Sequence, residues 1–150
     1  MENIFIRYAV DKDASFLFQL VNDRLCRENS LNSQKITLEE HMDWFKKILH
    51  SDAQRQYILM NGTSPIGQGR LEARGDACRI SYSIVQKYRG CGYGKILIQL
   101  LNNAAAKDFP ECNSCFGEVL KGNVASQKIF EELGFSFEER DDYFYYLKRL

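Results

Sequence analysis

The sequence lacks several features that would assign it to a special class of protein. Prolines number only two, and no apolar run approaches the about 18 residues of a membrane-spanning helix. Net charge is absent too, because 20 basic side chains balance 20 acidic ones. This balance gives no reason to expect nucleic acid or an anionic membrane as a partner. Residues 1–10 lack the segments of a signal peptide, so we expect a cytoplasmic protein.

The cysteines argue against disulfides and against a metal. They are odd in number and widely spread, as is typical of reduced thiols: Cys26, Cys78, Cys91, Cys112 and Cys115. Cys112 and Cys115 have the spacing of a zinc half-site. A structural zinc needs four ligands, however, and no second pair stands at such spacing. We therefore predict no metal.

A chain of 150 residues suits one domain, residues 1–150. Periods of two and of 3.6 in the apolar residues predict its strands and helices. A capping box, Thr37-x-x-Glu40, marks the start of the second helix. The predicted strands are 4–8, 57–60, 66–72, 80–85, 114–120, 135–139 and 142–150, and the predicted helices are 11–26, 37–49, 95–101 and 123–133.

A glycine-rich turn joins the strand at 80–85 to the following helix. It reads Arg89-Gly90-Cys91-Gly92-Tyr93-Gly94-Lys95. Glycines remove the Cβ atoms that would keep a ligand from the backbone, and amide groups at a helix N-terminus favour an anion. Arg89 and Lys95 add positive charge, so the turn predicts a phosphate or diphosphate site. A thiolate at Cys91 would repel such a ligand, so we expect a neutral thiol there.

Two other phosphate-binding motifs fit this turn poorly. A dinucleotide-binding turn opens its domain, and an acid at the end of the next strand follows about 20 residues later. Here the turn lies past mid-chain, and Asp108 follows a helix. A P-loop would close on Lys-Ser or Lys-Thr, which is absent. A tight turn without any ligand is the remaining alternative.

Two motifs together resemble the GNAT acetyltransferase superfamily. Arg89-x-x-Gly92-x-Gly94 is similar to the family's loop for the pyrophosphate of an acyl-coenzyme A. Asn123-x-x-Ser126-x-x-x-Phe130-Glu-x-x-Gly-Phe is similar to its second signature, roughly 30 residues later. The resemblance implies an α+β, GNAT-type acyltransferase fold. Its mixed, mostly antiparallel sheet would have about seven strands, with four helices on both faces.

The resemblance also implies acetyl-CoA as cofactor and assigns residues to it. The backbone of one strand would bond the pantetheine amides, the glycine-rich turn would hold the pyrophosphate, and an asparagine would contact the pantetheine arm. Asn123 also has the simpler reading of a helix N-cap, which is compatible with that contact. The residues concerned are Tyr82, Ser83 and Ile84; Arg89, Gly90, Cys91, Gly92, Tyr93, Gly94 and Lys95; and Asn123.

Acetyl transfer to an amine needs a base, because most amines are protonated near neutral pH. Glu118, five residues before Asn123, resembles the glutamate base of members that acetylate the alanine amino terminus of a ribosomal protein. Its simpler reading is an exposed strand carboxylate. Members often place a tyrosine seven residues after the asparagine as acid for the thiolate, and here that position is Phe130. The acid would then be Tyr143, Tyr145 or water, or the thiolate would leave unassisted.

The acceptor is inferred from two further stretches. Residues 27–45 and Ile66-Gly-Gln-Gly-Arg70 are similar to the N-acetyltransferases of bacterial nonulosonic acid synthesis, which acetylate the 4-amino group of a UDP-linked 4-amino-4,6-dideoxy sugar. Amides suit sugar hydroxyls, and a diphosphate needs a cation. The expected substrate-binding residues are Asn32, His41, Gln68 and Arg70. His41 would face the site and Trp44 the core, although a surface or core histidine is the simpler reading.

Two other functions remain open from the sequence. One is acetylation of a protein amino terminus or of a small amine. The other is an acyl-CoA-binding module without turnover, for which Phe130 is the hint. Many relatives pair through their C-terminal strands, so the aromatic run at 143–146 is either a homodimer surface or part of the core.

Overall fold

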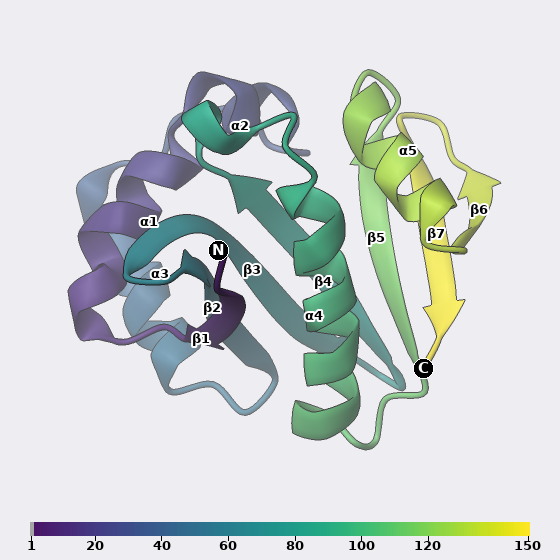
Figure 1. The fold of residues 1–150 in the computed structure, drawn as a ribbon, viewed down its shortest axis with the longest axis horizontal. Coiled ribbons are helices and arrows are strands. Elements are labelled where there is room, and N and C mark those ends of the chain that lie inside the picture. The colour runs from purple at the N-terminus through teal and green to yellow at the C-terminus, as the bar shows by residue number, and fades with distance from the viewer. Residues whose placement is uncertain (1) are drawn as a thin grey trace.

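A single seven-stranded sheet organises residues 2–150, the part of the chain that the computed structural model describes (Figure 1). The spatial order is β1-β2-β3-β4-β5-β7-β6, and every neighbouring pair is antiparallel except β4 and β5. This confirms the expected mostly antiparallel α+β sheet. The strands are β1 (Ile4–Tyr8), β2 (Gln54–Asn61), β3 (Ser64–Arg74), β4 (Ala77–Ile84), β5 (Ser114–Leu120), β6 (Ser136–Glu139) and β7 (Tyr143–Arg149).

The described chain has five α-helices, one more than expected. They are α1 (Ala14–Val21), α2 (Arg24–Glu28), α3 (Leu38–Leu49), α4 (Tyr93–Asp108) and α5 (Val124–Glu132). The additional helix arises because the helix predicted over 11–26 breaks at Asp23. That residue has extended ψ, and its side chain accepts a hydrogen bond from the Cys26 amide at 3.3 Å, which makes it the N-cap of α2. Asp11 does not cap α1; it begins a short 3₁₀ turn.

Strand alternation divides the core between the two faces of the sheet. Tyr57 and Leu59 of β2 pack in the cluster that contains α4. Ile58 and Met60, which point to the other face, pack with Leu17 of α1 and Phe45 of α3. Figure 1 shows α4 and α5 in front of the sheet. Helix α4 therefore covers the apolar side chains on one face of the sheet, and α1 and α3 cover those on the other face.

The one parallel contact, between β4 and β5, is short. Only Ala77–Arg79 of β4 pair with Ser114–Phe116 of β5. Beyond these residues β4 continues to pair with β3, and β5 with β7. The two strands therefore diverge toward the end of the molecule where α4 and α5 begin (Figure 1).

Two residues of the C-terminal aromatic run, Phe144 and Tyr146, pack in the core, while Tyr143 and Tyr145 are half-buried on the opposite face of the sheet. β7 pairs with β5 on one side and β6 on the other, so neither of its edges is free for another copy. Tyr146 is fully buried and stacks on Phe130 at 5.3 Å between ring centroids. Phe144 packs against the same cluster. A homodimer through the edges of this strand is thus excluded, although a homodimer through another surface remains a prediction.

The cysteines are all free within the described residues. The Sγ atoms of Cys78 and Cys112 lie 3.3 Å apart near the closed end of the β4–β5 pair. Burial raises the pKa of the Cys115 thiol to about 12. Residues 2–150 contain no group of three metal-ligating side chains. None of the helices in this range has the length and apolar character needed to cross a bilayer.

Gly117→Ala tests the packing of β5 against α5. A Cβ at this position would lie 2.6 Å from Cζ of the buried Phe130 ring, so we expect a loss of about 1–3 kcal/mol in unfolding free energy. Gly122→Ala is the control, because a Cβ there meets nothing within 4 Å. Urea unfolding measures both. Equal midpoints for the two variants would contradict this packing.

Candidate functional site

The glycine-rich turn presents backbone amides at the start of α4. Gly90 and Gly92 have φ of 76° and 87°, and a Cβ on either would meet nothing within 4 Å. Gly92 is the N-cap and supplies no side-chain bond. Within residues 2–150, the N–H groups of Tyr93, Gly94 and Lys95 donate no hydrogen bond. Unpaired amides at the N-terminus of a 16-residue helix have the geometry that suits an anion, and the diphosphate site remains a prediction.

Gly94 has a different role from the other two glycines. A Cβ there would lie 2.9 Å from Cδ1 of Ile129 and 3.4 Å from Cε2 of Tyr82. The missing side chain therefore allows α4 to approach α5 and β4. The expectation that all three glycines open the backbone to a ligand fits Gly90 and Gly92, while Gly94 is needed for helix packing.

Both basic residues of the turn already have partners. Arg89 donates from Nη2 to Asp23 Oδ2 at 2.6 Å and from Nε to the Ile84 carbonyl at 2.9 Å. Burial opposes ionisation of Asp23, but the hydrogen bonds from Arg89 and the Cys26 amide outweigh it and lower the pKa of that carboxyl. Lys95 lies 3.5 Å from Glu132. Anion binding here therefore rests chiefly on the amides.

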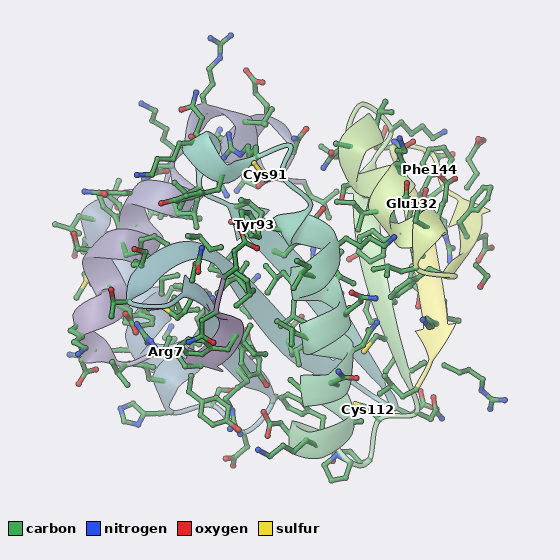
Figure 2. The ribbon with its side chains drawn as sticks, viewed as in Figure 1. Arg7, Cys91, Tyr93, Cys112, Glu132 and Phe144 are labelled. Atoms are coloured by element: carbon green, nitrogen blue, oxygen red, sulfur yellow. The ribbon has the colours of Figure 1, made fainter. Side chains whose placement is uncertain are left out.

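The two other side chains of the turn point different ways. Cys91 is exposed, and Figure 2 shows it in the loop before α4. Tyr93 is buried, and its hydroxyl donates to Glu2. Tyr93 therefore offers only its backbone amide to a ligand.

The diverging strands leave two free backbone edges. Tyr82, Ser83 and Ile84 pair with β3 alone, and residues 117–120 pair with β7 alone. Unpaired backbone groups need partners, and an extended arm with amides supplies them. Asn123 follows β5 and caps α5, its Oδ1 accepting from the Ser126 amide at 3.2 Å. The simpler reading of Asn123 is thus confirmed, and its contact with a ligand remains a prediction.

An ion pair bridges β4 and β5 where they diverge. Arg79 Nε lies 2.8 Å from Glu118 Oε1, and Arg74 Nη1 lies 3.8 Å from the same oxygen. The Arg79 and Glu118 side chains are only 18% and 13% exposed. Oε2 of Glu118 forms no hydrogen bond with residues 2–150. This carboxylate is therefore not the exposed strand residue of the simpler reading, and Oε2 is its available acceptor.

Polar side chains continue across the same face onto β3 and β2. Gln68 accepts from Gln56 Nε2 at 2.6 Å and donates to Ser83 Oγ at 2.9 Å. Arg70 lies over the Trp44 ring, with its Cζ 5.2 Å from the ring centroid. Burial lowers the pKa of the Arg70 guanidinium, and the positive charge of Arg79 acts in the same direction. Gln68, Arg70 and Glu118 thus share one face of the sheet.

The structure does not bring the other two expected acceptor residues to this face. His41 is 2% exposed, lies 3.1 Å through Nε2 from the Ala14 carbonyl, and packs between Phe18 and Phe45. Burial lowers the pKa of its imidazole. The expected roles are therefore reversed, because His41 is a core residue and Trp44 meets Arg70. Asn32 makes only local bonds, accepting from the Gln34 amide at 3.1 Å.

Sequence reasoning missed Arg79 and Ser81. The alternation of β4 could have found them, since Arg79, Ser81 and Ser83 are two residues apart and must share a face. No sequence pattern predicts that Arg79 contacts Glu118, which is 39 residues away.

The sequence profile described as "Acetyltransferase (GNAT) domain" matches residues 3–136. The chain belongs to the GNAT acetyltransferase family. It is an acetyl-CoA-dependent N-acetyltransferase, and the diphosphate site and the free strand edges fit that cofactor. The cofactor supplies an acetyl thioester, and the unpaired amides of α4 are the groups that would hold its diphosphate. A comparison with curated protein sequences found no significant match.

Solved structures share this family fold. A spermidine N-acetyltransferase from Vibrio cholerae in complex with CoA and spermine has a TM-score of 0.85 at 18% identity, over 97% of this chain and 95% of that one. The aminoglycoside acetyltransferase AAC(6')-Ib, in complex with paromomycin and acetyl-CoA, has a TM-score of 0.85 at 17% identity, over 98% and 93%. A domain from Methanocaldococcus jannaschii has a TM-score of 0.85 at 21% identity over 100% of both chains.

Gly92→Asp tests the anion site. The new carboxylate would stand at the helix N-cap and repel the diphosphate, so we expect CoA affinity to fall by about tenfold or more in calorimetry. Gly62→Asp is the control, because Gly62 also has positive φ, 61°, with nothing near its Cβ position, but lies in the β2–β3 turn. If both variants bind CoA like the unaltered chain, α4 does not hold the diphosphate.

Proposed function

We propose that the acceptor is the 4-amino group of a UDP-linked 4-amino-4,6-dideoxy sugar, acetylated during the synthesis of nonulosonic (pseudaminic) acid or a surface polysaccharide. The observation that carries the proposal is Arg70. Its guanidinium is half-buried and stacked on Trp44, and it forms no hydrogen bond or ion pair with residues 2–150. A half-buried cation without an anion is costly, and a bound diphosphate would relieve that cost.

The surroundings of Arg70 strengthen this requirement for an anion. The positive charges of Arg79 and Arg74 oppose its ionisation, and only Glu72 favours it. Glu72 itself is bonded to Arg74 at 2.7 Å. A polyamine would add further positive charge beside Arg70, whereas a nucleotide diphosphate would bring compensating negative charge.

The neighbouring amides suit the sugar part of such a substrate. Gln56, Gln68 and Ser83 form a hydrogen-bonded row beside Arg70, and amides and hydroxyls both donate and accept. The resemblance of residues 27–45 and 66–70 to the nucleotide-sugar enzymes supports the same acceptor.

In the proposed reaction, Glu118 takes the proton of the attacking amine through Oε2, directly or through water. Arg79 holds the other carboxylate oxygen at 2.8 Å and so positions the Glu118 side chain.

Acetylation of a protein amino terminus or a small amine is the alternative function. An α-N-protein acetyltransferase of ribosomal L7/L12 in complex with CoA has a TM-score of 0.84 at 17% identity, over 98% of this chain and 94% of that one. The free cysteines support the proposed cytoplasmic location.

A thiol-release assay with acetyl-CoA tests the acceptor. We expect release with the UDP-amino sugar and little with peptides or polyamines. Arg70→Gln should raise KM for the sugar by about tenfold or more and change kcat little, because the diphosphate loses its cation. Arg24→Gln is the control, since its side chain is 92% exposed on α2. Release with the peptide or the polyamine alone would exclude the nucleotide sugar.

Glu118→Gln separates an enzyme from an acyl-CoA-binding module without turnover. We expect kcat to fall by about 10²-fold, because the amide cannot take a proton, while CoA affinity stays unchanged in calorimetry. Glu138→Gln serves as control, since this carboxylate is 66% exposed on β6. Unchanged turnover in Glu118→Gln would remove the base role. No thiol release with any amine would favour the binding module.

A further inference from the structure

Position 130 has no room for the tyrosine that many family members place there. The Phe130 ring is 1% exposed and points its tip at β5. A Cβ on Gly117 would lie 2.6 Å from Cζ and 3.0 Å from Cε1 of this ring. A hydroxyl on Cζ would therefore press into the β5 backbone. If the departing thiolate is protonated, its proton therefore comes from another side chain or from water.

Tyr82 brings a hydroxyl to the same core from β4. Its ring meets Phe130 edge-on, with ring centroids 6.4 Å apart. Its Oη lies 4.0 Å from the position of a Cβ on Gly94, in the first turn of α4. It also lies 2.6 Å from Oγ of Ser126, in the first turn of α5. The hydroxyl is thus placed where the two helices begin, at the open end of the gap between β4 and β5.

The Tyr82 and Ser126 hydroxyls together retain one unused donor. Each carries one hydrogen, and their mutual bond uses only one of the two. Neither oxygen has another hydrogen-bond partner within residues 2–150. Burial raises the pKa of the Tyr82 phenol, so it is neutral and protonated near neutral pH. Tyr143 and Tyr145 are less suited, because Tyr145 pairs with Glu118 on the opposite face of the sheet.

We propose that Tyr82 is the general acid of this acetyltransferase, with Ser126 as its hydrogen-bonded partner. The amine nitrogen forms a bond to the acetyl carbon and loses its proton to the base. The C–S bond breaks, its electron pair stays on sulfur, and sulfur takes the phenolic proton of Tyr82. Once CoA has left, the Tyr82 phenolate takes a proton from water that enters the emptied site, and Ser126 remains its hydrogen-bonded partner. This assignment does not depend on which amine is the acceptor.

Calorimetry with CoA and desulfo-CoA, which lacks the thiol, tests whether Tyr82 meets the sulfur. In the unaltered chain CoA should bind about threefold to tenfold more tightly than desulfo-CoA, because a hydrogen bond to sulfur is lost. Tyr82→Phe should bring the ratio of the two affinities to about one. Tyr146→Phe is the matched control: it removes a hydroxyl from the same buried core, and it should keep the ratio of the unaltered chain.

Turnover completes the test. Tyr82→Phe should lower kcat by about 10²-fold, and Ser126→Ala should lower it less. Phe130→Tyr, added to Tyr82→Phe, should not restore the rate. Equal binding ratios in the unaltered chain and in Tyr82→Phe would overturn the proposal even if turnover fell, because the tyrosine would then be structural. A ratio near one in the unaltered chain, or a kcat that Tyr82→Phe leaves unchanged, would overturn it as well.

Discussion

The interruption of hydrogen bonding between β4 and β5 is the constraint on which the site depends. Three residues of each strand pair, and the remainder of each keeps only one partner strand. Unpaired backbone groups inside a sheet are costly unless a ligand completes them. The strands diverge toward the first turn of α4, whose amides also lack partners within residues 2–150. One arrangement therefore leaves both free strand edges, which suit an extended arm, and unpaired helix amides, which suit a diphosphate.

The two faces of this gap differ in chemistry. One face carries Glu118 and Arg79, which bridge the strands, together with Arg70, which has no hydrogen-bond or ion-pair partner in residues 2–150. The other carries Tyr82 in an apolar wall closed by Phe130. In the proposed reaction the amine loses its proton on the polar face and the thiolate gains one on the apolar face. The proposed acid and base therefore lie in environments of different polarity.

The strands, the capping box and the two family motifs follow from local sequence. Alternating apolar residues fix which side chains share a face, and the hydroxyl of Thr37 with the carboxylate of Glu40 is enough to begin α3. The break at Asp23 was not predictable from apolar spacing, because residues 16–25 keep a helical period through it. The helix breaks at Asp23 because its side chain accepts hydrogen bonds from the Cys26 amide and from Arg89, a residue 66 positions away.

By itself the sequence determined the family, the order of the strands and the position of the glycine-rich turn, because these depend on contacts between neighbouring residues and on motifs of fixed spacing. Only the tertiary structure decided which charges are free. It paired Arg89 with Asp23 and placed Arg70 over the Trp44 ring without a carboxylate partner in residues 2–150. It also buried His41 in the core, away from the predicted site. Charges separated by tens of residues meet only when the sheet assembles. The periodicity of one segment therefore cannot reveal which of them are left for a substrate.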